Sequence, residues 1–336
     1  MSEDAVIKET EGSVVSRRGE AAGRITRLAN HMRAARDPEL RARLYDMEPE
    51  WKPPVYHRNE KIEFEGFTAD FLTCADEAEY LPGGGKGRFE NFLKLLKNNV
   101  RPESYENKAV LQLHGGGYYE GMHNSYRDVS VIYSMFAGGA GVLTPDYRTA
   151  PEDPYPAALE DALCSYEFLL KEYKPEDILF AGDSAGGGLE LALALYLKDH
   201  GMPLPAGIIA MSAWTDLTKS GASYEEKFDD DPVFGGTVDS LVWKDGYYAG
   251  HDPAEPYISP LFGDMSGMPP MLMQVGDREM LLSDTLSVAE HAKEKGVQVK
   301  LHVYPGMFHI FQMGMFLYPE AVEAWEEAGR FIKEIW

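Results

Sequence analysis

The chain has 336 residues, of which 44% are hydrophobic and 26% are charged, a balance typical of a globular protein with a sizeable core. Its formal net charge of −23 argues against nucleic acid and anionic membranes as partners, because both also carry negative charge. No stretch approaches 18 apolar residues, and the polar start MSEDAVIKETEG lacks the apolar core of a signal peptide. The two cysteines, Cys74 and Cys164, fit a reducing compartment, so we expect a cytoplasmic protein with no membrane contact.

Residues 1–50 are rich in Arg, Glu and Ala and contain few large apolar side chains. Their pattern predicts two helices, over 16–36 and 38–45, which we interpret as an appendage packed on the main domain. The alternative is a charged N-terminus without a fixed structure. Residues 61–73 alternate apolar and polar side chains and predict one half-buried strand. Residues 75–107 then hold a PGGGKG turn, a short predicted helix and a polar loop.

From residue 108 onward, short apolar runs alternate with helix-like segments. This alternation predicts a parallel, doubly wound sheet with helices on both faces. The stretch 215–260 interrupts it and is loop-rich and aromatic, which fits either part of a lid or an ordinary surface excursion. The predicted strands cover 109–114, 140–147, 177–183, 206–214, 271–277 and 299–305, and the predicted helices cover 156–173, 185–199, 283–295 and 319–335.

A G-x-S-x-G pattern, Gly182-Asp183-Ser184-Ala185-Gly186, lies between a predicted strand and a predicted helix. Such a turn is so tight that its central residue takes a strained backbone conformation, and the flanking glycines avoid clashes. The serine oxygen then stands at the carboxyl end of the sheet, facing the positive N-terminus of the helix. The pattern predicts Ser184 as a catalytic nucleophile. The alternative is a glycine-rich helix start that packs closely on the sheet.

A second glycine run, HGGG over 114–117, also follows a predicted strand. A run of this kind lets backbone N–H groups point at one oxygen, and with the N–H of Ala185 they would form an oxyanion hole. The alternative is a flexible glycine turn. Two such motifs, each placed after a strand, favour the catalytic interpretation.

A serine nucleophile needs a general base, and the chain has nine histidines from which to draw it. His309 follows the last predicted strand and precedes the final helix, which fits the order Ser, acid, His of α/β-hydrolases. The strand over 271–277 ends close to two carboxylates, Asp277 and Glu279. Either could orient His309 and stabilise its charged form, and composition does not separate them.

Four blocks, HGGGY, DYRTAPEDPYPAALED, GDSAGG and YPGMFH, occur in this order along the chain. On these blocks, residues 105–336 resemble the hormone-sensitive-lipase family of α/β-hydrolases. The resemblance implies an α/β-hydrolase fold, with an eight-stranded, mostly parallel sheet, helices on both faces and a helical cap. It implies that 1–50 and 215–250 form the cap over the acyl pocket and that 51–336 form the catalytic domain. Against the family pattern, 75–107 resemble an insertion.

The resemblance also implies roles for individual residues. The family's acid typically lies 30 residues before the histidine, which favours Glu279, in an E-x-L-L pattern, over Asp277. Some members of the family form dimers, so a homodimer is one expected arrangement. The remaining implied site residues are the oxyanion donors Gly116, Gly117 and Ala185 and the pocket residues Tyr118 and Asp183.

These observations predict a serine carboxylesterase that hydrolyses short-chain acyl esters through an acyl-enzyme. The alternatives are a deacetylase or phenolic esterase acting on acetylated carbohydrate or a small metabolite, and, more remotely, an inactive ligand receptor on the same fold. The expected partner of such an enzyme is a small-molecule ester. No metal-binding spacing is present, and the reaction needs neither metal nor organic cofactor. Three aromatic residues of the excursion either wall the acyl site or pack beneath the cap: Phe228, Phe234 and Tyr247.

Overall fold

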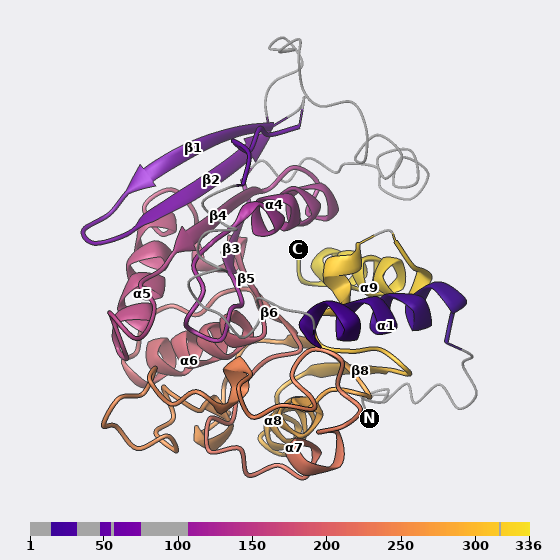
Figure 1. Cartoon of the computed structure of the whole chain (residues 1–336). Coiled ribbons are helices and arrows are strands. Elements are labelled where there is room, and N and C mark those ends of the chain that lie inside the picture. The colour runs from indigo at the N-terminus through magenta and orange to yellow at the C-terminus, as the bar shows by residue number, and fades with distance from the viewer. Residues whose placement is uncertain (1–14, 32–47, 55–56, 75–106, 316) are drawn as a thin grey trace, which may run out of the picture.

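Eight strands form a single sheet in the order β1-β2-β4-β3-β5-β6-β7-β8 in the computed structural model (Figure 1). From β4 to β8 all neighbouring strands are parallel, whereas β2 pairs antiparallel with both β1 and β4. The predicted eight-stranded, mostly parallel sheet is therefore confirmed. The strands are β1 His57–Glu63, β2 Thr68–Cys74, β3 Ala109–Leu113, β4 Gly141–Asp146, β5 Ile178–Asp183, β6 Gly207–Met211, β7 Met271–Gly276 and β8 Val299–Tyr304.

The structure describes residues 15–31, 48–54, 57–74, 107–315 and 317–336. The predicted helix over 38–45 and the predicted insertion, apart from residue 107, lie outside this part of the chain. Within the N-terminal segment, α1 (Arg17–His31) lies inside the predicted helix over 16–36. No helix among the described residues is both long and apolar enough to cross a membrane.

The prediction of one strand over 61–73 is wrong, because this stretch contains the turn of the β1–β2 hairpin. Gly66 takes a φ of +91°, a conformation that glycine adopts without steric cost. The Phe64 N–H donates to the Phe67 carbonyl over 3.0 Å, and the two rings stack with their centroids 4.5 Å apart. Alternating side chains continue on both sides of the turn, which is why the pattern resembled a single strand.

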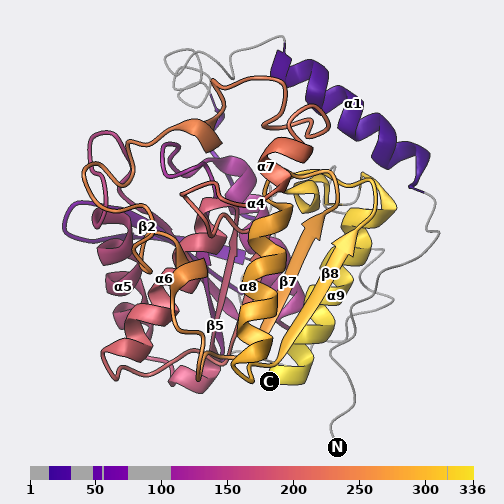
Figure 2. The same cartoon turned by 90° about the horizontal axis from the view of Figure 1, so that it is seen from below.

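Helices cover both faces of the sheet (Figure 2). Successive residues of β5 point to opposite faces, so Phe180 joins the core beneath α5, α6 and α8, and Leu179 joins the core beneath α4 and α9. Burial on both faces explains why the central strands form continuous apolar runs in the sequence. The helices are α4 Asn124–Phe136, α5 Ala157–Leu169, α6 Ala185–Asp199, α7 Ser223–Glu226, α8 Leu282–Glu294 and α9 Pro319–Ile335.

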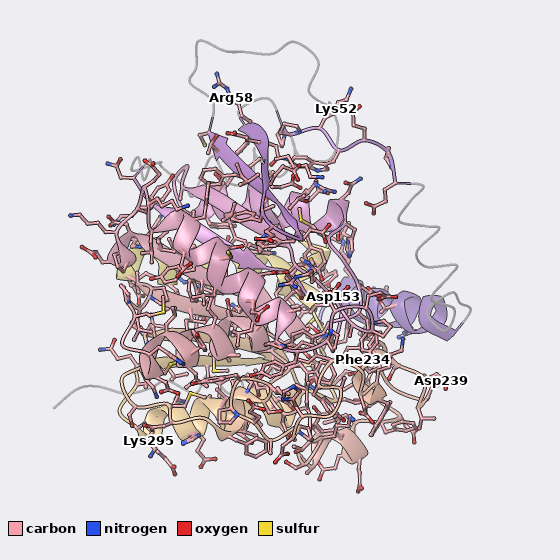
Figure 3. All side chains as sticks on the ribbon, turned by 90° about the vertical axis from the view of Figure 1, so that its left-hand side faces the viewer. Lys52, Arg58, Asp153, Phe234, Asp239 and Lys295 are labelled. Atoms are coloured by element: carbon pink, nitrogen blue, oxygen red, sulfur yellow. The ribbon has the colours of Figure 1, made fainter. Side chains whose placement is uncertain are left out.

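The excursion over 215–260 contains α7 and a short 3₁₀ helix, Leu241–Trp243, joined by loops. Figure 3 shows its residues Phe234 and Asp239 on the side of the molecule where α1 lies. Val233 of the excursion and Ala22 of α1 pack against the same small apolar cluster. Two segments that are far apart in the sequence therefore meet at the carboxyl-terminal side of the sheet.

Glu190 is a fully buried carboxyl group on α6. Neither of its side-chain oxygens has a hydrogen-bond partner among the residues that the structure describes. Burial, and to a smaller extent the nearby charge of Asp183, raises the pKa of Glu190 well above its ordinary value. Ionisation of this group is therefore costly in the folded protein.

We expect Glu190→Met to raise the free energy of unfolding at pH 7 by about 1–3 kcal/mol, because it removes an unsatisfied buried polar group. When the pKa of a carboxyl group is higher in the folded than in the unfolded protein, the group favours folding most at a pH below its unfolded-state pKa. This contribution to the free energy of unfolding is lost as the pH rises toward the folded-state pKa. The advantage of the variant should therefore grow between pH 5 and pH 8. Urea unfolding at both pH values measures this, with the exposed Glu167→Met as the control. An advantage that is independent of pH would contradict the expectation.

Candidate active site

Ser184 joins β5 to α6 with a φ of 53° and a ψ of −123°, a conformation that non-glycine residues rarely adopt. Its backbone is held from two sides. The Ser184 N–H donates to the Met211 carbonyl over 2.9 Å, and the Ser184 carbonyl accepts from the Trp214 N–H over 2.8 Å. These bonds fix the strained turn and direct the side chain away from the sheet, where 4% of the residue remains exposed.

The glycines of the motif permit the close approach of α6 to the sheet. A Cβ atom added to Gly186 would lie 2.0 Å from the Leu113 carbonyl oxygen, and one added to Gly182 would lie 2.7 Å from Gly186. Neither position accepts a side chain without a shift of the backbone. The N-terminus of α6 is thereby brought directly behind Ser184, where its partial positive charge favours developing negative charge.

His309 and Glu279 complete a hydrogen-bonded chain that begins at Ser184. His309 Nε2 lies 2.9 Å from Ser184 Oγ, and His309 Nδ1 lies 3.0 Å from Glu279 Oε2. His309 is 2% exposed and Glu279 is fully buried. Because an ionised carboxylate only accepts hydrogen bonds, it holds the proton on Nδ1 and leaves Nε2 free to accept the serine proton. This arrangement is suited to nucleophilic catalysis by a serine.

Glu279 is held by two further donors at its other oxygen. Its Oε1 accepts from Ser212 Oγ over 2.8 Å and from the Gly276 N–H. Ser212 itself accepts from the Ile310 N–H, in the residue after His309, over 3.2 Å. Ser212 therefore links the acid to the histidine loop. It belongs to no motif, and its position directly after β6 is the only signal in the sequence that marks it.

Asp277, the alternative acid, has a different partner. Its Oδ1 accepts from the Gly306 N–H over 2.7 Å, which ties the loop after β7 to the turn after β8. Burial raises the pKa of Asp277, and this hydrogen bond opposes that effect. The structure thus brings Glu279, and not Asp277, within hydrogen-bond distance of His309.

The glycine run after β3 contains two residues with positive φ, Gly116 at 117° and Gly117 at 63°. Among the residues that the structure describes, the N–H groups of Gly116, Gly117 and Ala185 have no protein acceptor. His114 fixes the start of the loop, since its Nδ1 lies 2.8 Å from the Gly115 carbonyl oxygen and its ring stacks on Tyr147 with centroids 4.1 Å apart. Three unpaired donors near a serine are suited to binding an oxyanion.

Asp183 lies beneath this loop and supports it. Its Oδ2 accepts from the Tyr126 hydroxyl over 3.3 Å, and the Gly115 backbone also donates to the carboxylate. Burial raises the pKa of Asp183 to about 7, while the positive charge of His309 and these hydrogen bonds act in the opposite direction. The predicted pocket residue is therefore a buried support for the glycine loop.

The four predicted aromatic residues occupy different places. Phe234 packs on His309, with ring centroids 4.4 Å apart, so it borders the catalytic histidine directly. Tyr118 and Tyr247 are both buried and stack at 3.7 Å. Phe228 packs against Trp243 of the 3₁₀ helix at 6.4 Å. Of these four aromatic rings, only that of Phe234 packs on the catalytic histidine within the described part of the structure.

Asp231 is a second buried residue that no sequence motif marks. Its carboxylate accepts from the Met280 N–H over 2.8 Å and from the Phe234 N–H over 3.1 Å. Burial raises its pKa. Asp231 therefore fastens the excursion to the residue that follows Glu279 and fixes the position of Phe234 beside His309.

A cavity of about 590 Å³ opens beside His309, between α1, Val233 and the segment after β8.

No group of three or more His, Cys, Asp or Glu side chains within the described ranges has a geometry that would hold a metal ion. The hydrogen-bonded chain of Ser184, His309 and Glu279 supports acid–base and nucleophilic chemistry.

Known proteins resemble this chain over most of its length. An acetyl-hydrolase of Streptomyces hygroscopicus is 39% identical over 235 residues, which cover 70% of this chain and 78% of the relative. An esterase of Acinetobacter venetianus is 34% identical over 235 residues, which cover 69% of this chain and 77% of the relative.

Solved structures agree with these relatives. An esterase from the bacterial hormone-sensitive lipase family is 30% identical, with a TM-score of 0.76 over 96% of this chain and 99% of that chain. The structure of EstE5 soaked with p-nitrophenyl butyrate is also 30% identical, with a TM-score of 0.77 and the same coverage. A family model described as alpha/beta hydrolase fold matches residues 110–313. The chain therefore belongs to the α/β-hydrolases, within the hormone-sensitive lipase family of esterases.

Proposed function

We propose that this protein is a serine carboxylesterase for short-chain acyl esters, with Ser184 as nucleophile, His309 as general base and Glu279 as the acid that orients it. Family membership supports the esterase class. One observation carries the residue roles: the continuous hydrogen-bonded chain from Ser184 Oγ through His309 to Glu279 in a buried site.

In the first half of the reaction, His309 Nε2 accepts the Ser184 hydroxyl proton while Oγ attacks the ester carbonyl carbon. The carbonyl oxygen becomes negatively charged and accepts hydrogen bonds from the N–H groups of Gly116, Gly117 and Ala185. Collapse of this intermediate breaks the bond to the alcohol oxygen, which takes the proton from His309. The products are the free alcohol and an acyl group bound to Ser184.

In the second half, a water molecule replaces the alcohol. His309 accepts one proton from the water, and the resulting hydroxide attacks the acyl carbon. The same backbone donors bind the second oxyanion. The acyl–serine bond then breaks, His309 returns the proton to Ser184 Oγ, and the carboxylic acid leaves. Glu279 accepts the hydrogen bond from His309 Nδ1 and stabilises the charged imidazolium.

A small acyl group is the best supported substrate. The Streptomyces relative is an acetyl-hydrolase, and EstE5 was soaked with a butyrate ester. The first of these also favours a second candidate, a deacetylase that acts on an acetylated carbohydrate or small metabolite. Both functions use the same triad and differ only in the alcohol.

We expect kcat/KM for p-nitrophenyl esters to be highest between acetate and butyrate and to fall at least about tenfold by octanoate. Parallel assays with acetylated xylo-oligosaccharide separate the two candidates. Faster release of acetate from the oligosaccharide than from simple alkyl acetates would support the deacetylase. A maximum at octanoate would contradict the short-chain assignment.

The cap is also part of the proposal. Residues of α1 and Val233 line the same cavity as His309 and pack against the same apolar cluster. This supports a cap on the catalytic domain (51–336) that is formed by the described part of 1–50 together with 215–250. The homodimer and the cytoplasmic location stay predictions. The alternative of an inactive ligand receptor requires that Ser184 reacts neither with an activated ester nor with a serine-directed probe.

A further inference from the structure

The cavity beside His309 has walls from three segments that are far apart in the sequence. Leu317, 63% exposed, lies at its rim, so the cavity opens to solvent on that side. The Tyr318 hydroxyl is already bonded to the Phe311 carbonyl, so it offers the cavity mainly a ring. Apolar side chains form most of the lining, among them Ala21 and Ala22 of α1, Val233, Met313 and Leu317.

The sheet order decides which half of an ester would enter this cavity. The glycine run follows β3, on one side of β5, whereas His309 follows β8, at the far end on the other side. A carbonyl oxygen bound by Gly116 and Gly117 therefore points away from β8. The ester's second oxygen must lie within reach of His309 Nε2, because it takes its proton there when the alcohol leaves. The carbon chain attached to that oxygen extends toward the His309 side.

We propose that this cavity holds the alcohol moiety, and that the preferred substrates are short-chain acyl esters of a bulky apolar alcohol. The inference rests on the proposed function and assigns α1 to the alcohol side, whereas the family resemblance implies a cap over the acyl pocket. A space of about 150 Å³ holds a benzene ring, and this cavity has about 590 Å³. An alcohol of ten or more heavy atoms fits such a volume, whereas methanol or ethanol would leave most of it unfilled.

Transfer of the acyl group to an added alcohol tests this assignment directly. The alcohol replaces water in the second half of the reaction: His309 accepts its hydroxyl proton, its oxygen attacks the acyl carbon, and the acyl–serine bond breaks. A new ester forms and Ser184 regains its proton. Because p-nitrophenol has already left at this stage, the ratio of new ester to free acid reports how well the added alcohol competes with water for the acyl-enzyme, through both its binding and its reactivity.

The experiment uses the full chain, with p-nitrophenyl acetate as acyl donor and methanol, butanol, 2-phenylethanol and a naphthyl-substituted ethanol as acceptors. We expect the ester-to-acid ratio per molar alcohol to rise at least about tenfold from methanol to the aromatic alcohols. Two variants fill the cavity from exposed positions, Ala21→Phe on α1 and Leu317→Trp at the rim. Each should lower the ratio about tenfold for the naphthyl alcohol and progressively less for smaller ones.

The control variant is Arg24→Phe, which adds the same aromatic ring to α1 at a side chain that is 81% exposed and does not line the cavity. It should leave all ratios within twofold of the wild type. Equal ratios for all alcohols, or variants that instead shift the acyl-chain profile, would overturn the alcohol assignment while leaving the esterase intact. Failure of the wild type to release p-nitrophenol would instead overturn the proposed function itself.

Discussion

Ser184→Ala is expected to lower kcat for ester hydrolysis by about 10⁵. The activity that remains is the small residual rate that the oxyanion donors and the other binding groups support without a nucleophile. The loss is this large because alanine leaves His309 with no oxygen to activate, so no acyl-enzyme forms. The fold should survive, since the substitution removes one hydroxyl and keeps the backbone bonds from Ser184 to Met211 and Trp214. Initial rates with p-nitrophenyl acetate, together with thermal unfolding, measure both quantities.

The matched control is Ser266→Ala, at an exposed serine that lies outside the hydrogen-bonded chain. Its rates should equal those of the wild type. A His309→Ala variant should lose about as much activity as Ser184→Ala, and the double variant should lose little more, because the two residues act as a unit. Additive losses would indicate that His309 acts on something other than Ser184.

The second large effect is expected from the acid. Glu279→Gln should lower kcat by about 10²–10⁴, because an amide cannot hold the His309 tautomer and stabilise the imidazolium as a carboxylate does. The amide NH₂ would also face another donor in either orientation. In one orientation it faces Ser212 Oγ and the Gly276 N–H, and in the other it faces the Nδ1–H of His309. Steady-state kinetics of purified variants measures the loss.

Asp277→Asn is the matched control, since it makes the same chemical change two residues away. We expect kcat within about threefold of the wild type, because Asp277 bonds to Gly306 and not to His309. A small loss of thermal stability would reflect that bond. Near-normal turnover by Glu279→Gln, or a large loss in Asp277→Asn alone, would contradict the assignment of the acid.

Much of the fold could be predicted from the sequence, because burial on both faces leaves a strong signal. β5 and β7 are buried at every residue and form short continuous apolar runs, and α6 and α9 begin and end at the predicted residues. The hairpin of β1 and β2 was missed, because side-chain alternation does not reveal a tight turn. α4 was also missed, since its sequence NSYRDVSVIYSMF is rich in Ser, Tyr and β-branched residues with modest helix propensity.

The candidate site divides in the same way. Ser184, His309 and the glycine run follow strands at the carboxyl edge of the sheet, so their meeting could be expected from topology. Asp277 and Glu279 could not be separated by residue type, because the difference between them is the direction in which a loop carries each side chain. Ser212 and the cavity beneath α1 could not be foreseen either, since both depend on contacts between distant segments.

Labelling with a fluorophosphonate probe tests the central claim most directly, because the probe phosphonylates only a serine that an adjacent base has activated. We predict one adduct per chain, located by peptide mass spectrometry on Ser184, with loss of esterase activity in proportion to labelling. Glu279→Gln should slow the labelling, and Ser184→Ala should abolish it. An adduct on another residue, or full esterase activity in a chain whose Ser184 is labelled, would contradict the account.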